Sequence, residues 1–169
     1  MASRIPVPLH APYVAAKHAL RGCLATLRVE LRSRGSGVRV CMVHPAFVNT
    51  PFFENATSVP GTIPRPLRPV YRTEVVAEAI LECARRPRPE VAVGGSAAAF
   101  TVIATVGRPL LDRILPTYGV RWQKTDLPAS EPGMLWAPSG QGRAHGRWRG
   151  RRSLWTALRL RNVRILRLP

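Results

Sequence analysis

One stretch of the sequence, residues Pro12–Gly35, constrains the fold more than any other because it predicts a single long helix. Tyr13 and Lys17 open one face of this helix, and the face continues with Leu20, Leu24, Leu27 and Leu31. Pro12 suits the first turn of a helix, and Gly35 suits a left-handed C-terminal cap. We therefore expect a helix whose apolar face is buried and whose first turn aims a tyrosine and a lysine in one direction.

The segment after this helix predicts a strand of a parallel sheet. Residues Val38–Val43 are almost continuously apolar, and the run breaks at His44-Pro45. A helix that precedes such a strand runs antiparallel to it, so the helix begins at the edge of the sheet where the strand ends. Tyr13, Lys17 and the loop over residues 45–53 should meet at this edge, where ligands of open α/β sheets bind.

The next elements complete the pattern of an α/β domain over residues 1–115. Residues Thr73–Arg86 predict a second helix with Thr73 as its N-cap and with an apolar face of Val75 or Val76, Ala79, Ile80 and Cys83. Residues Glu90–Val93 predict a short strand that ends at a glycine pair. A third helix is expected from Ser96, as its cap, to about Leu115, with an interruption near Gly107. This order indicates the second half of a doubly wound parallel sheet.

Residues 116–169 predict a basic, largely disordered tail. Proline, glycine, serine and arginine dominate it, above all in residues 140–152, and such a composition does not assemble a packed core. Residues 154–168 regain leucines without a consistent period. Docking on the fold, peripheral contact with a membrane surface, and neither of these all stay open for this last segment.

The formal net charge of +17 raises the question of an anionic partner. Only Lys17 and Lys124 of the 26 basic residues are lysine, which indicates a codon bias toward arginine more than selection for a charged surface. We therefore do not expect a nucleic-acid partner.

The three cysteines and the start of the sequence bear on the compartment. Cys23, Cys41 and Cys83 fall within predicted helices and strands without metal spacing, so we expect small core residues in a reducing compartment. The first residues lack the pattern of a signal peptide, and no apolar run is long enough to span a bilayer. We expect a cytoplasmic protein. His10, His18 and His44 have no acidic or cysteine partner at metal spacing, so no metal site is expected.

Tyr13 and Lys17 form the pair that could carry chemistry. Side chains four residues apart share a helix face. An ammonium beside a phenol favours the phenolate, so the pair could supply an acid or a base closer to neutral pH than a free tyrosine with a pKa of about 10.

The sequence resembles the short-chain dehydrogenase/reductase family over about residues 1–115. The resemblance lies in the YVAAK motif, the apolar helix and strand that follow it, and the loop HPAFVNT after the strand. It implies a Rossmann-type fold, NAD or NADP as cofactor, and hydride transfer between the nicotinamide and a small carbonyl or alcohol substrate. In that reading Tyr13 is the general acid or base, and Lys17 binds the nicotinamide ribose and lowers the tyrosine pKa. Further residues would line the nicotinamide: Pro45, Ala46, Val48 and Thr50. Ala46 stands where the family usually has glycine.

Other parts of the family pattern are missing from the sequence. The family's serine would fall immediately before Met1, with Ser3 out of register, and neither the active-site asparagine nor the glycine-rich phosphate loop is found. We therefore expect the C-terminal half of such an enzyme, truncated and inactive as an isolated chain. Two alternatives stay open: a non-catalytic fragment that pairs, as a homo-oligomer, through the Pro12–Gly35 helix, and a binder of nucleic acid or membrane surfaces through the basic tail.

Overall fold

The computed structural model describes residues 1–56, 61–129 and 142–161. The elements follow the order α1 (Ala11–Ser33), β1 (Met42–Pro45), α2 (Phe52–Asn55), α3 (Thr73–Arg85), β2 (Glu90–Val93), α4 (Gly95–Val106), α5 (Arg108–Ile114), the π-helical turn η1 (Leu115–Gly119), α6 (Val120–Gln123) and α7 (Leu154–Arg161). Helices around a small parallel sheet make a partial Rossmann-like α/β fold, which confirms the predicted fold class.

Within the described residues, β1 and β2 form the sheet. They pair in parallel, from Met42 opposite Glu90 to Pro45 opposite Val93. The second strand has its predicted bounds, but the first is shifted from Val38–Val43 to Met42–Pro45. The shift has a simple reason, because a strand is defined by its ladder and the four residues of β2 offer partners only from Met42 onward.

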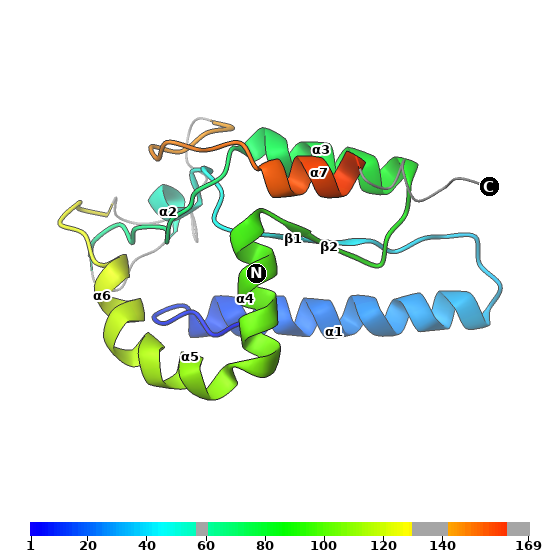
Figure 1. Cartoon of the computed structure of the whole chain (residues 1–169), viewed down its shortest axis with the longest axis horizontal. Coiled ribbons are helices and arrows are strands. Elements are labelled where there is room, and N and C mark those ends of the chain that lie inside the picture. The colour runs from blue at the N-terminus through cyan, green and yellow to red at the C-terminus, as the bar shows by residue number, and fades with distance from the viewer. Residues whose placement is uncertain (57–60, 130–141, 162–169) are drawn as a thin grey trace.

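Helix α1 runs along one side of the two strands, while α3 and α7 lie on the other side (Figure 1). It is antiparallel to β1, so its first turn lies at the carboxyl end of the strands, as predicted (Figure 1). Pro12 is in the first turn, and Gly35 closes the helix with a φ of 65° while the Ser36 N–H donates to the Leu31 carbonyl at 2.9 Å.

The expectation of a buried leucine face on α1 is wrong for the described residues. No residue of α1 is buried, and Leu20 and Leu27 are 49% and 38% exposed. Cys23, expected in the core, is also exposed. Periodicity predicted which residues share a face, but it could not predict what the described elements place against that face.

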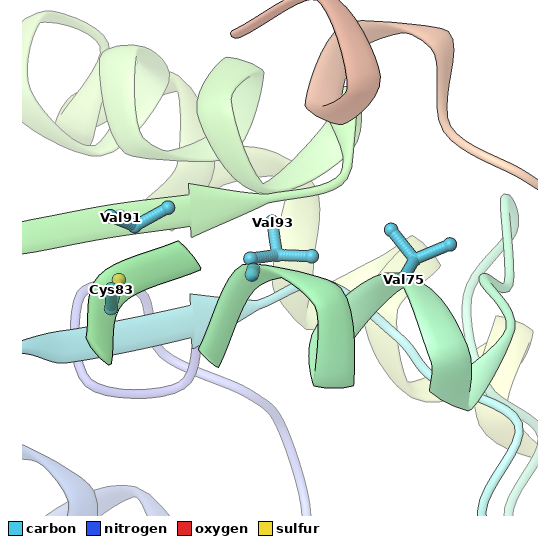
Figure 2. Close-up of a cluster of buried hydrophobic side chains, with 5 residues drawn as sticks. Val75, Cys83, Val91 and Val93 are labelled. Atoms are coloured by element: carbon cyan, nitrogen blue, oxygen red, sulfur yellow. The ribbon is translucent and has the colours of Figure 1, made fainter. Parts of the chain in front are cut away.

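Helix α3 supplies the best-packed core. Val75, Ala79 and Cys83 lie against Val91 and Val93 of β2, and Figure 2 shows Val75 and Cys83 on the helix with Val91 and Val93 on the strand. All five are buried, which is the normal source of stability for a helix on a sheet. Cys41, Val43, Val76 and Leu160 pack around the rim.

Two predicted details of α3 are wrong. Thr73 is not the N-cap, because Arg72 occupies that position and the Thr73 hydroxyl instead contacts Glu74 Oε2 at 3.3 Å and His145 Nδ1 at 3.0 Å. Ile80, expected on the apolar face, is 53% exposed. The competing partners of Thr73 come from its neighbour and from a residue far along the chain, so local pattern alone could not decide between them.

The predicted third helix is divided, as expected, near Gly107. Helix α4 ends there with the Gly107 N–H donating to the Ile103 carbonyl at 2.7 Å, and α5 follows. Ser96 is not the cap of α4, since Gly94 takes that position with a φ of 93°. Leu111 of α5 packs with Met1 and Ile5 in a second buried cluster.

The structure differs from the sequence prediction for parts of residues 116–169. Residues 115–123 are helical, and α7 lies against α3 and α4. The Ser153 hydroxyl caps α7 by accepting the Thr156 N–H at 3.1 Å. Composition indicated disorder because it counts residue types, whereas these contacts depend on a few individual side chains.

Candidate active site

A cavity of about 720 Å³ contains every residue that the sequence singled out for chemistry. Tyr13 and Lys17 line it from the first turns of α1. Residues at the end of β1 and in the loop behind it line it from the other side: Pro45, Ala46, Val48 and Thr50. The β-α-β geometry predicted this meeting of α1 with the loop, and the structure brings the two together.

The Tyr13 side chain lies at the border of this cavity, with 37% of its surface exposed. Its ring packs against the ring of Phe52 in α2, with centroids 5.2 Å apart and an interplanar angle of 47°. The Lys17 Nζ lies 5.3 Å from the centroid of the Tyr13 ring. The ammonium thus sits over the ring face in a cation–π arrangement.

This arrangement changes the expected acidity of Tyr13. Burial raises the pKa of the phenol above its ordinary value, whereas the sequence analysis expected Lys17 to lower it. The reason lies in the geometry, since desolvation by the surrounding side chains acts on the hydroxyl while the ammonium faces the ring. Tyr13 therefore carries its proton at neutral pH and is a weaker acid than an ordinary tyrosine.

Backbone hydrogen bonds fix the loop after β1. The Ala46 N–H donates to the Val93 carbonyl at 2.9 Å, and the Asn49 N–H donates to the Tyr71 carbonyl at 2.8 Å. The Tyr71 N–H in turn donates to the Phe47 carbonyl at 2.8 Å. Among the described residues Leu9 is the only non-glycine with a positive φ, so Ala46 is accommodated without backbone strain where the resembled family has glycine.

The rest of the cavity wall is mainly apolar. Leu20 and Leu24 contribute from α1, and Val76 and Ile80 contribute from α3. Polar and charged side chains interrupt this apolar wall at several positions: Ser3, His10, Arg21, His44, Thr73 and Gln123. Part of the exposed apolar surface of α1 and α3 therefore belongs to the wall of one cavity.

A cluster of polar and charged side chains around the buried His44, at the wall of the cavity, was missed by the sequence analysis. His44 Nδ1 is 3.0 Å from the Ser3 hydroxyl, and His44 Nε2 is 3.6 Å from Glu90 Oε2. Glu90 also forms ion pairs with Arg4 and, at 3.4 Å, with Arg21. His44 and Glu90 share a sheet face, as the parallel register between β1 and β2 requires, and only that register could have revealed the pair.

A second contact missed by the sequence analysis lies behind the loop. Glu54 of α2 accepts hydrogen bonds from Arg143 Nη2 and from the Arg147 N–H, both at 2.8 Å. The Trp148 N–H donates to Asn49 Oδ1 at 2.9 Å. Residues from the basic tail thus contact the segment that directly follows the candidate site.

Two further properties concern the described residues as a set. None of their histidine, cysteine, aspartate and glutamate side chains gathers into a group of three that could hold a metal ion. None of their helices is long and apolar enough to cross a bilayer.

Comparisons with known proteins agree with the resemblance of the motifs. Residues 1–61 match the family model described as short chain dehydrogenase. An uncharacterized oxidoreductase of Bacillus subtilis (strain 168), YxnA, is 31% identical over 123 residues, which cover 72% of this chain and 35% of that protein. The match therefore spans about a third of the length of this curated relative. No solved structure matches the chain.

Proposed function

The chain belongs to the short-chain dehydrogenase/reductase family, and from this premise we propose that it contributes to hydride transfer between NAD or NADP and a small carbonyl or alcohol substrate. One observation carries the proposal. Tyr13, Lys17 and the loop over residues 45–50 are separated by about thirty residues of sequence, yet they line one cavity.

In the proposed reaction Tyr13 is the general acid for carbonyl reduction. The phenol carries its proton at neutral pH, as any tyrosine does, and the proton passes to the substrate oxygen as negative charge develops there. In the oxidation direction the deprotonated oxygen of Tyr13 receives the proton from the alcohol. The reduced nicotinamide, when bound, supplies the hydride.

Lys17 has two tasks in this proposal. Its ammonium lies 5.3 Å from the centre of the Tyr13 ring and holds that ring through a cation–π contact. Its three donors also suit the hydroxyls of the nicotinamide ribose. A compact ammonium on a flexible stem can serve both, whereas a planar guanidinium would need a different position.

The residues present fit the nicotinamide end of the cofactor. A cavity of about 720 Å³ is within the range of small-molecule sites, and it offers an apolar wall together with the Lys17 ammonium and the Thr50 hydroxyl. We propose that Pro45, Ala46 and Val48 line the site of the nicotinamide ring. The Thr50 hydroxyl would form a hydrogen bond with the nicotinamide. The choice between NAD and NADP is made by an acidic or basic residue at the adenosine ribose, which is not among these residues.

For the isolated chain of 169 residues we propose weak or absent cofactor binding and no turnover. The sequence contains no G-x-G-x-x-G turn, the motif that binds a pyrophosphate at a helix N-terminus. A fluorescence titration of this chain with NADPH tests the proposal. Saturation at micromolar NADPH would contradict it.

Turnover is tested in a preparation that oxidises NADPH in the presence of a carbonyl compound, whether this chain or a longer product of the same gene. Tyr13→Phe should lower kcat by about 10²- to 10⁴-fold while leaving NADPH affinity nearly unchanged, because it removes only the transferable proton. Lys17→Arg should also lower kcat. Tyr118→Phe is the matched control, because Tyr118 lies in η1 and is half exposed. A Tyr13→Phe enzyme that keeps most of its rate would remove Tyr13 from the mechanism.

We further propose that α1 supports self-association and that the protein works in a reducing compartment such as the cytoplasm. Leu20 and Leu27 expose apolar surface along α1, and the three cysteines are all free. Sedimentation velocity tests the first part, because Leu27→Glu should then shift the protein toward monomer. An unchanged sedimentation coefficient in that variant would exclude pairing through this part of α1.

A further inference from the structure

Residues 142–151, which we name the basic strap, lie against the segment that follows the candidate site. Glu54 stands at the centre of the contact, with its side chain 10% exposed. Arg143 approaches its Oε2 at 2.8 Å, and the Arg147 side chain approaches its Oε1 at 3.9 Å. Two arginines on one largely buried carboxylate form a stronger contact than an isolated surface ion pair.

The strap is also fixed through its backbone. The Gly146 N–H donates to the Asn49 carbonyl at 3.2 Å, and the Trp148 N–H donates to Asn49 Oδ1 at 2.9 Å. Farther along, the Arg151 N–H donates to the Val70 carbonyl at 2.8 Å, and the Arg72 N–H donates to the Arg151 carbonyl at 3.0 Å. The strap thus follows the loop after β1 and then the segment that leads into α3.

Two glycines allow this close approach. A Cβ on Gly146 would collide with the Thr50 carbonyl oxygen, and a Cβ on Gly150 would lie 3.0 Å from the Arg72 nitrogen. A Cβ on Gly142, in contrast, would meet no atom within 4 Å. The glycines at 146 and 150 therefore have a structural role in a segment whose composition alone indicates disorder.

The contact reaches the candidate site through α2. This single helical turn, Phe52–Asn55, carries Glu54 on the strap side, and its Phe52 packs on the Tyr13 ring with centroids 5.2 Å apart. We infer that Glu54 is a positioning residue, which holds the strap on α2 and thereby keeps Phe52 on the Tyr13 ring. An effect of Glu54 on catalysis rests on the proposed function. The contact between Glu54 and the strap does not depend on that function.

Hydrogen exchange followed by mass spectrometry tests the contact in the 169-residue chain without any ligand. Three variants weaken it by different means: Glu54→Gln, the double variant Arg143→Gln/Arg147→Gln, and Gly146→Ala. Peptides from the strap and from residues 47–56 should exchange about tenfold faster in each variant, because a charged hydrogen bond is lost or the backbones are forced apart. Peptides from residues 75–93 should stay protected, which shows that the fold persists.

Matched controls separate the contact from general effects of charge or glycine content. Arg149→Gln removes an arginine from the same segment, and the Arg149 side chain makes no hydrogen bond or ion pair within the described residues. Gly142→Ala adds a methyl group where there is space. Both controls should exchange like the wild type. Unchanged exchange in Glu54→Gln and Gly146→Ala as well would overturn the inference.

Ultraviolet titration of the Tyr13 phenol tests the link to the site. The Tyr13 signal is obtained as the difference between each protein and the same protein carrying Tyr13→Phe. Burial raises the pKa of Tyr13, so release of Phe52 in Glu54→Gln should lower it toward about 10, while Arg149→Gln should leave it unchanged. If the strap loosens but the Tyr13 titration does not move, Glu54 does not position the site. Both measurements are independent of turnover, so their failure is distinct from failure of the proposed reaction.

Discussion

At the scale of single residues, His44 shows how a side chain from the middle of a strand becomes sensitive to pH. It is only 6% exposed, and burial, together with the positive charges of the Met1 amino group, Arg4 and Arg21, lowers its pKa from 6.5 to about 4. Its Nε2 has no hydrogen-bond partner in the described residues, although Glu90 Oε2 lies 3.6 Å away. The neutral imidazole is therefore the form that suits the fold.

The first prediction follows from this lowered pKa. In the unfolded chain His44 takes up a proton near pH 6.5, whereas in the folded chain it does so only near pH 4. Protons thus favour the unfolded state between these values, so this contribution to stability is complete above pH 6.5 and is lost as the pH falls toward 4. The full loss is at most about 3 kcal/mol.

Thermal unfolding followed by circular dichroism at pH 7, 5.5 and 4 measures the effect. His44→Gln should lose less stability across this range than the wild type, because the group that takes up the proton is gone. His18→Gln, which changes an exposed histidine of α1, should follow the wild type. If the melting temperatures of wild type and His44→Gln changed equally with pH, His44 would not be the group that takes up the proton on unfolding.

At the scale of elements, two glycines that look alike in the sequence have opposite requirements. Gly22 lies inside α1, where an added Cβ would meet no atom within 4 Å. Gly94 joins β2 to α4 with a φ of 93°, and an added Cβ would lie 2.5 Å from the ring of the buried Tyr71. The Tyr71 ring has little freedom to move away, because its hydroxyl accepts the Ser96 N–H at 3.4 Å.

The second prediction is that alanine changes stability in opposite directions at these two positions. Gly22→Ala should stabilise the protein by about 0.5–1 kcal/mol, because alanine loses less entropy than glycine in a helix. Gly94→Ala should destabilise it by about 2 kcal/mol or more, because both the positive φ and the space are lost. Urea unfolding gives both values. Changes of the same sign would show that the turn after β2 is not as described.

The sequence predicted those elements whose formation depends on neighbours along the chain. The span of α1, its cap at Gly35, the bounds of β2 and the break at Gly107 all follow from local residues, and the meeting of Tyr13 with the loop after β1 follows from β-α-β geometry. What failed depended on partners far apart in sequence: the exposure of Leu20, the lost cap at Thr73, and the direction of the Tyr13 pKa. The spacing of residues along the chain does not reveal which side chain, such as Phe52, will pack on the Tyr13 ring and desolvate it.

At the scale of the whole molecule, residues 142–161 contact both the loop after β1 and the helix α3. Tyr71 forms isolated parallel β-bridges with Val48 on one side and with Arg151 on the other. The strap therefore continues the parallel pairing of backbones next to the sheet. Helix α7 then lies on α3, as Figure 1 shows, and its Leu160 packs at the rim of the main core. Residues 142–161 are therefore part of the folded unit in this structure.

The last prediction tests this arrangement with one hydroxyl group. Thr156 of α7 is 2% exposed, and its Oγ1 accepts the Gly94 N–H at 2.9 Å and donates to the Ser153 hydroxyl at 2.9 Å. Thr156→Val keeps the shape of the side chain but leaves the buried Gly94 N–H without its partner, which should cost about 1–3 kcal/mol of unfolding free energy.

Thr105→Val is the matched control for this change. Its hydroxyl is exposed and donates only along α4, to the Thr101 carbonyl at 3.0 Å, so unfolding free energy should change by no more than about 0.5 kcal/mol. Urea unfolding of both variants separates the two accounts of the C-terminal residues. If residues 142–161 were a tail apart from the fold, Thr156→Val would be as neutral as Thr105→Val, since a solvated hydroxyl has no buried donor to satisfy. A clear loss of stability in Thr156→Val alone would place α7 in the same cooperative unit as β2 and α4.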